Sequence, residues 1–230
     1  MPKKTFKKNF SKINNHIFCY DTETGDKDPY TCDVLEFTGV VIDINTLQIK
    51  DEIFGPVLVK PLGNDYSRVK EEALKKNGIN IEEVKAKGLD QQVFFEQLTA
   101  FMAKFRRSEK RWDALIPSGF NTTNFDNVIM RQMAVRYGYV EQETDPKLFH
   151  PFHSMDLADL LRPWFYDTNT LESFSLENVR KFFGMSNVGA HTSLYDVEST
   201  AKILCRLLKL YKGLAPKYLG QFKDAFAEQV

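Results

Sequence analysis

The chain has 230 residues, of which 43% are hydrophobic and 27% are charged, a balance typical of a globular protein and not of a disordered one. Its 31 basic and 31 acidic residues cancel, so no global field indicates a nucleic-acid partner, although a local patch would not show in that total. Three cysteines without a C-x-x-C spacing argue against a zinc ribbon or a disulfide framework, and neither a membrane-spanning run nor the apolar stretch of a secretory signal is present. We therefore expect one soluble, cytoplasmic domain without a membrane partner.

The N-terminal part of the chain predicts a basic tail followed by three strands. Residues 1–14 contain several lysines and no acid, and we expect a flexible tail there. A short continuous apolar run then precedes two stretches rich in β-branched residues, which are typical of strands. These patterns predict strands at 17–20, 34–44 and 53–59, with a turn at 45–50. The short connections favour antiparallel pairing.

The remainder of the chain predicts helices that alternate with short strands. Helical spacing of apolar residues, with Gly78 as a stop signal, predicts helices at 67–77, 93–105, 125–137, 176–183 and 194–211. A further helix is expected from Asp156, and short strands are expected at 114–116 and 152–155. A meander followed by alternating elements indicates the α/β class, with a mixed sheet of about five strands flanked by helices. We expect one domain over residues 15–212 and a C-terminal helix or docking segment at 213–230.

The first candidate site is Tyr20-Asp21-Thr22-Glu23-Thr24, at the end of the first predicted strand. Because side chains alternate along a strand, Asp21 and Glu23 point to the same side of it. Two adjacent carboxylates repel one another, and a divalent cation is the natural partner for them. An Asp-x-Glu arises easily by chance, so a solvated strand end is the alternative interpretation.

Two further motifs follow predicted strands or precede predicted helices. In the segment from Gly119 to Asp126, the final acid either caps the next helix or projects a third carboxylate toward the first pair. In the segment from Gly189 to Asp196, a histidine at His191 stands five positions before an acid at the start of the last long helix. Taken alone, such a histidine is more often a surface or capping residue than a catalytic one.

These residues form an ordered set: Asp21 and Glu23, then Asp126, then His191 and Asp196. In this order and at these separations, the set resembles the DEDD family of 3′–5′ exonucleases, in the subgroup with histidine. The resemblance covers about residues 16–212 and includes the Phe-Asn-x-x-x-Phe-Asp and Gly-Ala-His contexts. The sister subgroup has a tyrosine four positions before the final acid, where this chain has Thr192.

Within this subgroup, local segments look most like the nuclease domain of bacterial exonuclease I, with proofreading subunits and ribonuclease T as near relatives. These segments are Val59-Lys60-Pro61, Gly119-Phe120-Asn121 and Ser173-Phe174-Ser175-Leu176-Glu177. The chain departs from the family pattern at Phe120, where other branches have a histidine. It also departs at Ser193 and Tyr195, where small alanines are frequent.

The resemblance implies an RNase H-like fold and a 3′–5′ exonuclease that releases nucleoside 5′-monophosphates from single-stranded DNA. It implies two Mg²⁺ or Mn²⁺ ions, bridged by Asp21, with Glu23 and Asp196 on the water-activating ion and Asp126 acting through bound water. His191 would accept the proton of the attacking water. The residues implied at the substrate are Thr22 and Thr24 at the terminal sugar, and Asn121 and Phe125 along the path of the strand.

Other interpretations remain open at this point. An exoribonuclease of oligoribonuclease or ribonuclease T type is one, since the residues that would read a 2′-hydroxyl cannot be identified. A catalytically silent nucleic-acid-binding module is another. The absence of one of the acids would favour this alternative, and all of them are present. The C-terminal segment leaves open a polymerase or another replication or repair protein as a partner. The basic cluster at 104–111 is either a phosphate contact or a solvated helix end.

Overall fold

The computed structural model describes residues 15–142, 145–166, 171–186 and 192–225, the last eleven of them by their backbone alone. The predicted tail at residues 1–14, His191 and residues 226–230 of the predicted C-terminal segment therefore lie outside the described residues.

A five-stranded mixed sheet forms the centre of the molecule. Its strands are β1 (His16–Thr24), β2 (Val34–Asp43), β3 (Gln48–Leu58), β4 (Ile116–Gly119) and β5 (Met155–Asp156), in the spatial order β3-β2-β1-β4-β5. The first three strands pair as an antiparallel meander, whereas β4 runs parallel to β1 and β5 runs parallel to β4. This arrangement confirms the predicted fold class.

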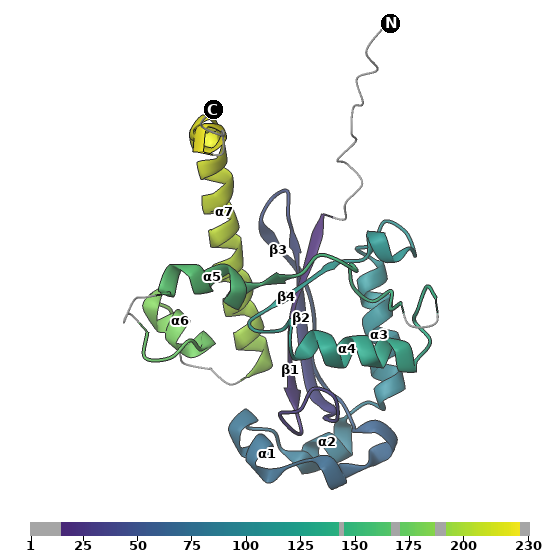
Figure 1. Ribbon diagram of the computed structural model, residues 1–230. Coiled ribbons are helices and arrows are strands. Elements are labelled where there is room, and N and C mark those ends of the chain that lie inside the picture. Colours follow the sequence, from purple (N-terminus) through teal and green to yellow (C-terminus); the bar gives the residue numbers. More distant parts are fainter. Residues whose placement is uncertain (1–14, 143–144, 167–170, 187–191, 226–230) are drawn as a thin grey trace, which may run out of the picture.

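Seven helices surround the sheet within the described residues (Figure 1). They are α1 (Glu71–Asn77), α2 (Ile81–Lys87), α3 (Gln91–Ala103), α4 (Asp126–Arg136), α5 (Leu157–Phe165), α6 (Leu176–Phe182) and α7 (Ser193–Ala225). Helices α3 and α4 cover one face of the sheet, and α5, α6 and α7 cover the other, while α1 and α2 lie at the end to which β1 points (Figure 1).

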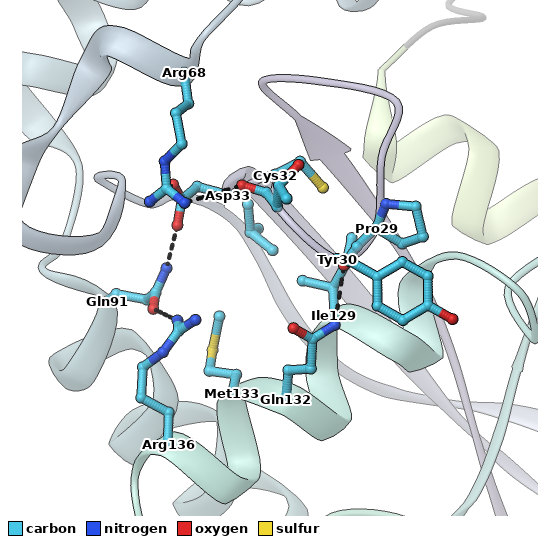
Figure 2. Close-up of a pocket in the computed structure, with 12 residues that line it drawn as sticks. Pro29, Tyr30, Cys32, Asp33, Arg68, Gln91, Ile129, Gln132, Met133 and Arg136 are labelled. Atoms are coloured by element: carbon cyan, nitrogen blue, oxygen red, sulfur yellow. Dashed lines mark hydrogen bonds and ion pairs between the residues drawn. The ribbon is translucent and has the colours of Figure 1, made fainter.

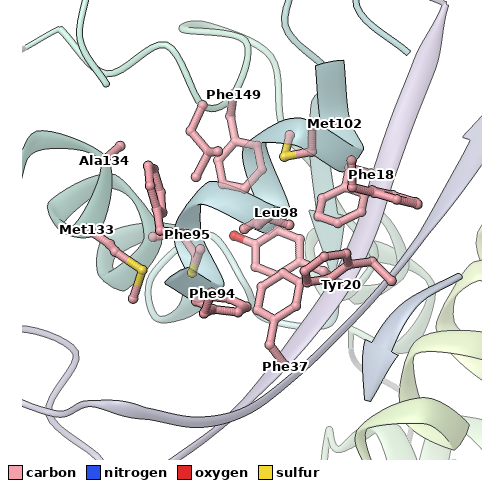
Figure 3. Packing of buried hydrophobic residues seen from close by; sticks show 14 of the residues in the cluster. Phe18, Tyr20, Phe37, Phe94, Phe95, Leu98, Met102, Met133, Ala134 and Phe149 are labelled. Atoms are coloured by element: carbon pink, nitrogen blue, oxygen red, sulfur yellow. The ribbon is translucent and has the colours of Figure 1, made fainter. Parts of the chain in front are cut away.

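The alternation of side chains along β1 divides the core into two layers. Phe18 and Tyr20 join an aromatic cluster with Phe37 and the side chains of α3 and α4 (Figure 3). Ile17 and Cys19 face the opposite layer, which α5, α6 and α7 complete. A Cβ at Gly39 would lie 2.3 Å from the Phe18 ring, so the close packing of β2 on this cluster requires glycine there.

Several predicted boundaries were wrong. The strand predicted at 114–116 is instead Ile116–Gly119, because pairing with β1 draws the Pro-Ser-Gly segment into the sheet. The strand predicted at 53–59 begins at Gln48, since the hairpin after β2 turns more tightly than expected. The helix predicted at 67–77 starts only at Glu71, after a short 3₁₀ turn at Tyr66–Arg68.

Helix α7 is longer than the helix predicted at 194–211, since it runs on to Ala225. Its last described side chains are largely exposed, including Leu210 (55%) and Leu214 (48%), and its C-terminal part extends away from the sheet (Figure 1). Among the described residues, no helix has the length and apolar character needed to cross a bilayer. A cytoplasmic location and a docking role for residues 213–230 stay predictions.

Candidate active site

Three of the predicted acids meet where β1 ends. Asp21 and Glu23 continue the Ile17–Cys19 side of β1, so they point toward the layer that contains α7. Asp196 lies in the first turn of α7. One carboxylate oxygen from each of these three residues lies within 4.8 Å of the others. The fold thus brings together acids that are up to 175 positions apart in the chain.

The fourth acid, Asp126, approaches from the opposite layer. It is the first residue of α4 and is buried. The backbone N–H of Thr22 donates to Asp126 Oδ1 over 3.2 Å, and the Thr22 hydroxyl donates to the same oxygen. Two residues earlier on β1, Tyr20 Oη donates to Oδ1 of Asn127, the next residue of α4, over 2.6 Å. These bonds fix the start of α4 against β1.

The crowding of these carboxylates perturbs their proton affinities. Burial, followed by the negative charges of Asp126 and Glu23, raises the pKa of Asp21 well above its usual value. Burial and the charge of Asp196 raise the pKa of Glu23 to about 8. Burial also raises the pKa of Asp126 to about 7, against the opposing effect of the Thr22 hydrogen bonds. Close negative charge therefore favours either a bound proton or a bound cation here.

The donor set fits the metal ions that the sequence predicted. The three converging ligands are all carboxylate oxygens, which suit Mg²⁺ or Mn²⁺ better than a metal that prefers nitrogen or sulfur. Burial and the neighbouring negative charges disfavour the anionic forms of Asp21 and Glu23 in the protein alone. Asp21, Glu23 and Asp196 are thus suited to hold a divalent cation, and Asp126 adjoins them through Thr22.

A cavity of about 520 Å³ opens beside Glu23, between the end of β1 and helix α1. Among the predicted substrate residues, Thr22, Thr24 and Phe125 line it. Thr24 is fixed in place, because its hydroxyl donates to the backbone oxygen of Asp26 over 2.7 Å. Its own carbonyl accepts from Asn77 Nδ2 over 3.2 Å. The cavity adjoins the acids and is large enough for one nucleotide.

Asn121 does not line this cavity. It is exposed, has a φ of 62°, and donates its backbone N–H to Asp156 Oδ1 over 2.8 Å. Asp156 also accepts from the backbone N–H of Thr123 over 2.9 Å and caps helix α5 through Ala158. Gly119 permits this turn, since a Cβ there would meet Thr122 and the carbonyl of Tyr20. The contribution of Asn121 to the fold is therefore a backbone one.

Sequence reasoning missed three charged residues that surround the acids. Glu36 stands directly opposite Glu23 in the β1–β2 pairing, and its charge helps to raise the pKa of Glu23. Lys76, which lines the cavity, acts in the opposite direction. Arg180 of α6 is buried and forms an ion pair with Asp196. The register of a hairpin could have identified Glu36, whereas no local pattern distinguishes the other two.

Ser193, one of the departures from the family pattern, is connected to Glu36. Its hydroxyl donates to Glu36 Oε1 and hydrogen-bonds with Thr38 Oγ1 at 2.6 Å. Ser193 is fully buried at the first residue of α7. These bonds attach the start of α7, and hence Asp196, to strand β2.

The basic cluster at 104–111 is largely paired within the protein. Lys104 pairs with Glu52, and Arg111 pairs with Glu141 and with Asp145. Arg106 donates to Tyr139 Oη and to the carbonyl of Lys147. This pairing favours the interpretation of the cluster as a structural helix end.

A second, smaller cavity of about 30 Å³ lies behind the loop that follows β1, and it has room for water only (Figure 2). Asp33 accepts there from Arg68 over 3.2 Å and from Gln91 over 3.1 Å. Arg136 of α4 donates a short hydrogen bond to Gln91 Oε1 (Figure 2). This network braces the loop between Glu23 and β2 against α3 and α4.

Comparisons with known proteins agree with this geometry. A family model described as "Exonuclease" matches residues 18–204. Ribonuclease T of Histophilus somni is 27% identical over 198 residues, which cover 84% of this chain and 84% of that protein. Exodeoxyribonuclease I of Haemophilus influenzae is 27% identical over 216 residues, which cover 90% of this chain but 42% of that protein.

Among solved structures, Escherichia coli exonuclease I in complex with a dT13 oligonucleotide matches with a TM-score of 0.66 and 21% identity. The match covers 90% of this chain and 43% of that one, so this chain spans less than half of the exonuclease I proteins it resembles. At this identity the likeness shows the fold, and it agrees with the RNase H-like architecture expected from the sequence.

Proposed function

The chain belongs to the exonuclease family, and from that premise we propose that it is a metal-dependent 3′–5′ exonuclease that hydrolyses single-stranded DNA to nucleoside 5′-monophosphates. The observation that carries the proposal is the convergence of Asp21, Glu23 and Asp196 beside a cavity of nucleotide size. Membership of this enzyme family favours an enzyme over the silent binding module that the sequence left open.

In the proposed mechanism, Asp21, Glu23, Asp126 and Asp196 hold two Mg²⁺ or Mn²⁺ ions. When bound, such a pair of ions activates water and neutralises the charge that develops on the phosphate. Thr22 favours the ionised form of Asp126 and orients this carboxylate through its two donated hydrogen bonds. His191, which lies outside the described residues, accepts the proton of the attacking water, as in the histidine subgroup that the chain resembles.

The terminal nucleotide occupies the cavity between β1 and α1 in this proposal. Thr22 and Thr24 border its sugar, and the ring of Phe125 packs against its base. Asn121 is exposed at a turn held by Asp156, and from there it meets the strand outside the cavity.

Digestion of labelled oligonucleotides tests this proposal. A 5′-labelled single strand should give a ladder that shortens from its 3′ end, with Mg²⁺ or Mn²⁺ required and a chelator inhibitory. Asp21→Asn should abolish the ladder, while Glu198→Gln, which changes a partly exposed acid of α7 paired with Lys202, should leave it unchanged. Rapid cleavage of a circular single strand would show an endonuclease and refute the proposal.

An exoribonuclease is the second candidate, and one observation favours it. The chain matches ribonuclease T over 84% of that protein's length, against 42% of exodeoxyribonuclease I. Matched DNA and RNA strands of one sequence separate the two candidates by their relative kcat/KM. A preference for RNA would replace the proposed substrate and leave the proposed chemistry in place.

A further inference from the structure

Arg180 is one of the largest fully buried side chains in the described part of the chain. An arginine cannot release its proton inside a protein, and a buried charge is costly unless it is paired. The carboxylate that it engages is Asp196, whose Oδ1 accepts from Arg180 Nη1. The same nitrogen lies 3.3 Å from Ser199 Oγ, and the guanidinium lies 5.2 Å from the centre of the Tyr195 ring.

This ion pair involves an acid that also belongs to the cluster suited to metal. An oxygen of Asp196 lies within 4.8 Å of oxygens of Asp21 and Glu23 while the arginine is engaged. The arginine therefore does not draw Asp196 away from the other acids. The same carboxylate thus serves the ion pair with Arg180 and stands in the acid cluster.

We propose that Arg180 is a built-in counter-ion of the acid cluster and a positioning residue for Asp196. It compensates and orients this carboxylate in the metal-free protein, and it shares the carboxylate with a cation once one is bound. The inference rests on the proposed function, because it requires that Asp196 takes part in cation binding.

A definite consequence follows for the metal-free protein. If Arg180→Met removes the fixed cation, the partly buried Asp196 carboxylate is left without it beside two further acids. A divalent cation can then supply the missing charge. Because binding and stability are linked, the cation should stabilise this variant more than it stabilises the unaltered protein.

The test is thermal unfolding of the full chain at one neutral pH, with chelator or with excess Mn²⁺. Without metal, Arg180→Met should lower Tm by ~6–20 °C, the range for breaking a buried ion pair in a chain of this length. Mn²⁺ should restore at least half of this loss in Tm. In a Mn²⁺ titration followed by electron paramagnetic resonance, the Kd for Mn²⁺ should be lower than in the unaltered protein by ~10-fold or more. Arg180→Lys should lose less than Arg180→Met, because it keeps the charge.

Two further variants separate the charge from packing. Lys181→Met removes the neighbouring exposed pair with Glu177 and should change neither Tm nor the Mn²⁺ response measurably. The double variant Arg180→Met with Asp196→Asn removes both charges. It should regain most of the metal-free Tm and lose the additional Mn²⁺ response, and it provides the same test if Arg180→Met alone does not fold.

Equal Mn²⁺ stabilisation in Arg180→Met and the unaltered protein would overturn the inference, as would a double variant no more stable than the single one. Either result would leave Arg180 a packing residue. Failure of the proposed function looks different, since the unaltered protein would then neither respond to Mn²⁺ nor shorten an oligonucleotide.

Discussion

At the scale of single residues, the hydroxyl of Thr22 tunes the charge of Asp126. Its hydrogen bond opposes the effect of burial on the pKa of Asp126, which is raised to about 7. Thr22→Val removes the hydroxyl and keeps the shape, so the pKa of Asp126 should rise further. Because more of this carboxyl is then protonated at neutral pH, kcat should fall ~10-fold there, as expected for one hydrogen bond to a charged group.

The pH–rate profile checks this prediction, since the loss should shrink as pH is raised above the new pKa of Asp126. Thr22→Ser keeps the donor and serves as the matched control, with a profile close to that of the unaltered protein. A loss in Thr22→Val that is equal at every pH would instead indicate displaced substrate and contradict the electrostatic role.

His191 provides the second prediction at this scale. If it accepts the proton of the attacking water, His191→Ala should lower kcat by ~10²–10⁴, the usual contribution of a positioned base. The rise of Tm on adding Mn²⁺ should be unchanged, because His191 is not expected to be a ligand. Asp21→Asn is the contrasting variant, which should lose both activity and the Mn²⁺ response. Nearly full activity of His191→Ala would remove the base from the mechanism.

At the scale of elements, Asp156 joins the loop after β4 to the start of α5. It accepts three backbone N–H groups, those of Asn121, Thr123 and Ala158, from a buried position. Asp156→Ala should cost about 2–4 kcal/mol, since a helix cap is lost and buried donors are left without acceptors. Urea unfolding measures this change.

The matched comparison is Asp159→Ala, in the same helix but exposed, which should cost under ~0.5 kcal/mol. Asp156→Ala should also raise KM for oligonucleotides more than it lowers kcat, because the loop that carries Asn121 loses its anchor. An unchanged KM would show that this loop does not meet the strand.

The elements that sequence patterns predicted most clearly are those that bury continuous or regularly spaced apolar residues. Strands β1 and β2 are buried along most of their length, and α3 and α4 bury residues at helical spacing, so their existence was evident. Helix α2 was missed because Val84 is its one buried residue, which leaves no period to detect. The length of α7 was underestimated, as Leu210 and Leu214, among its last described side chains, are about half exposed.

In the site too, short-range sequence patterns predicted some residues, whereas long-range packing determines the others. Strand alternation predicted that Asp21 and Glu23 share a side, and the structure has them together with Asp196. Arg180 and Lys76 reach the acids only through the packing of α6 and α1, which no short-range pattern contains. Glu36 faces Glu23 through the β1–β2 register, which the predicted strands alone did not assign.

At the scale of the whole molecule, the two core layers hold α4 and α7 on opposite faces of β1 and thereby force like charges together. The folded protein consequently retains protons that an unfolded chain releases. The pKa of Glu23 rises from 4.5 to about 8, and that of Asp126 from 3.8 to about 7. Metal-free stability should therefore be greatest in mild acid and should fall as pH rises through this window.

We expect the metal-free Tm to drop by at least ~3–5 °C between pH 5 and pH 8.5, the effect of about one pKa unit in a chain of this length. Mg²⁺ or Mn²⁺ should abolish the drop, because a cation stabilises the ionised carboxylates that the fold disfavours. Glu23→Gln should reduce the drop in chelator and raise Tm at pH 8.5, whereas Glu198→Gln, at a partly exposed acid of α7 paired with Lys202, should leave the curve as it is. Differential scanning calorimetry across this range measures all four curves. A metal-free Tm that rises steadily to pH 8.5 would mean that the acids are compensated within the protein, and the need for a cation at β1 would lose its physical basis.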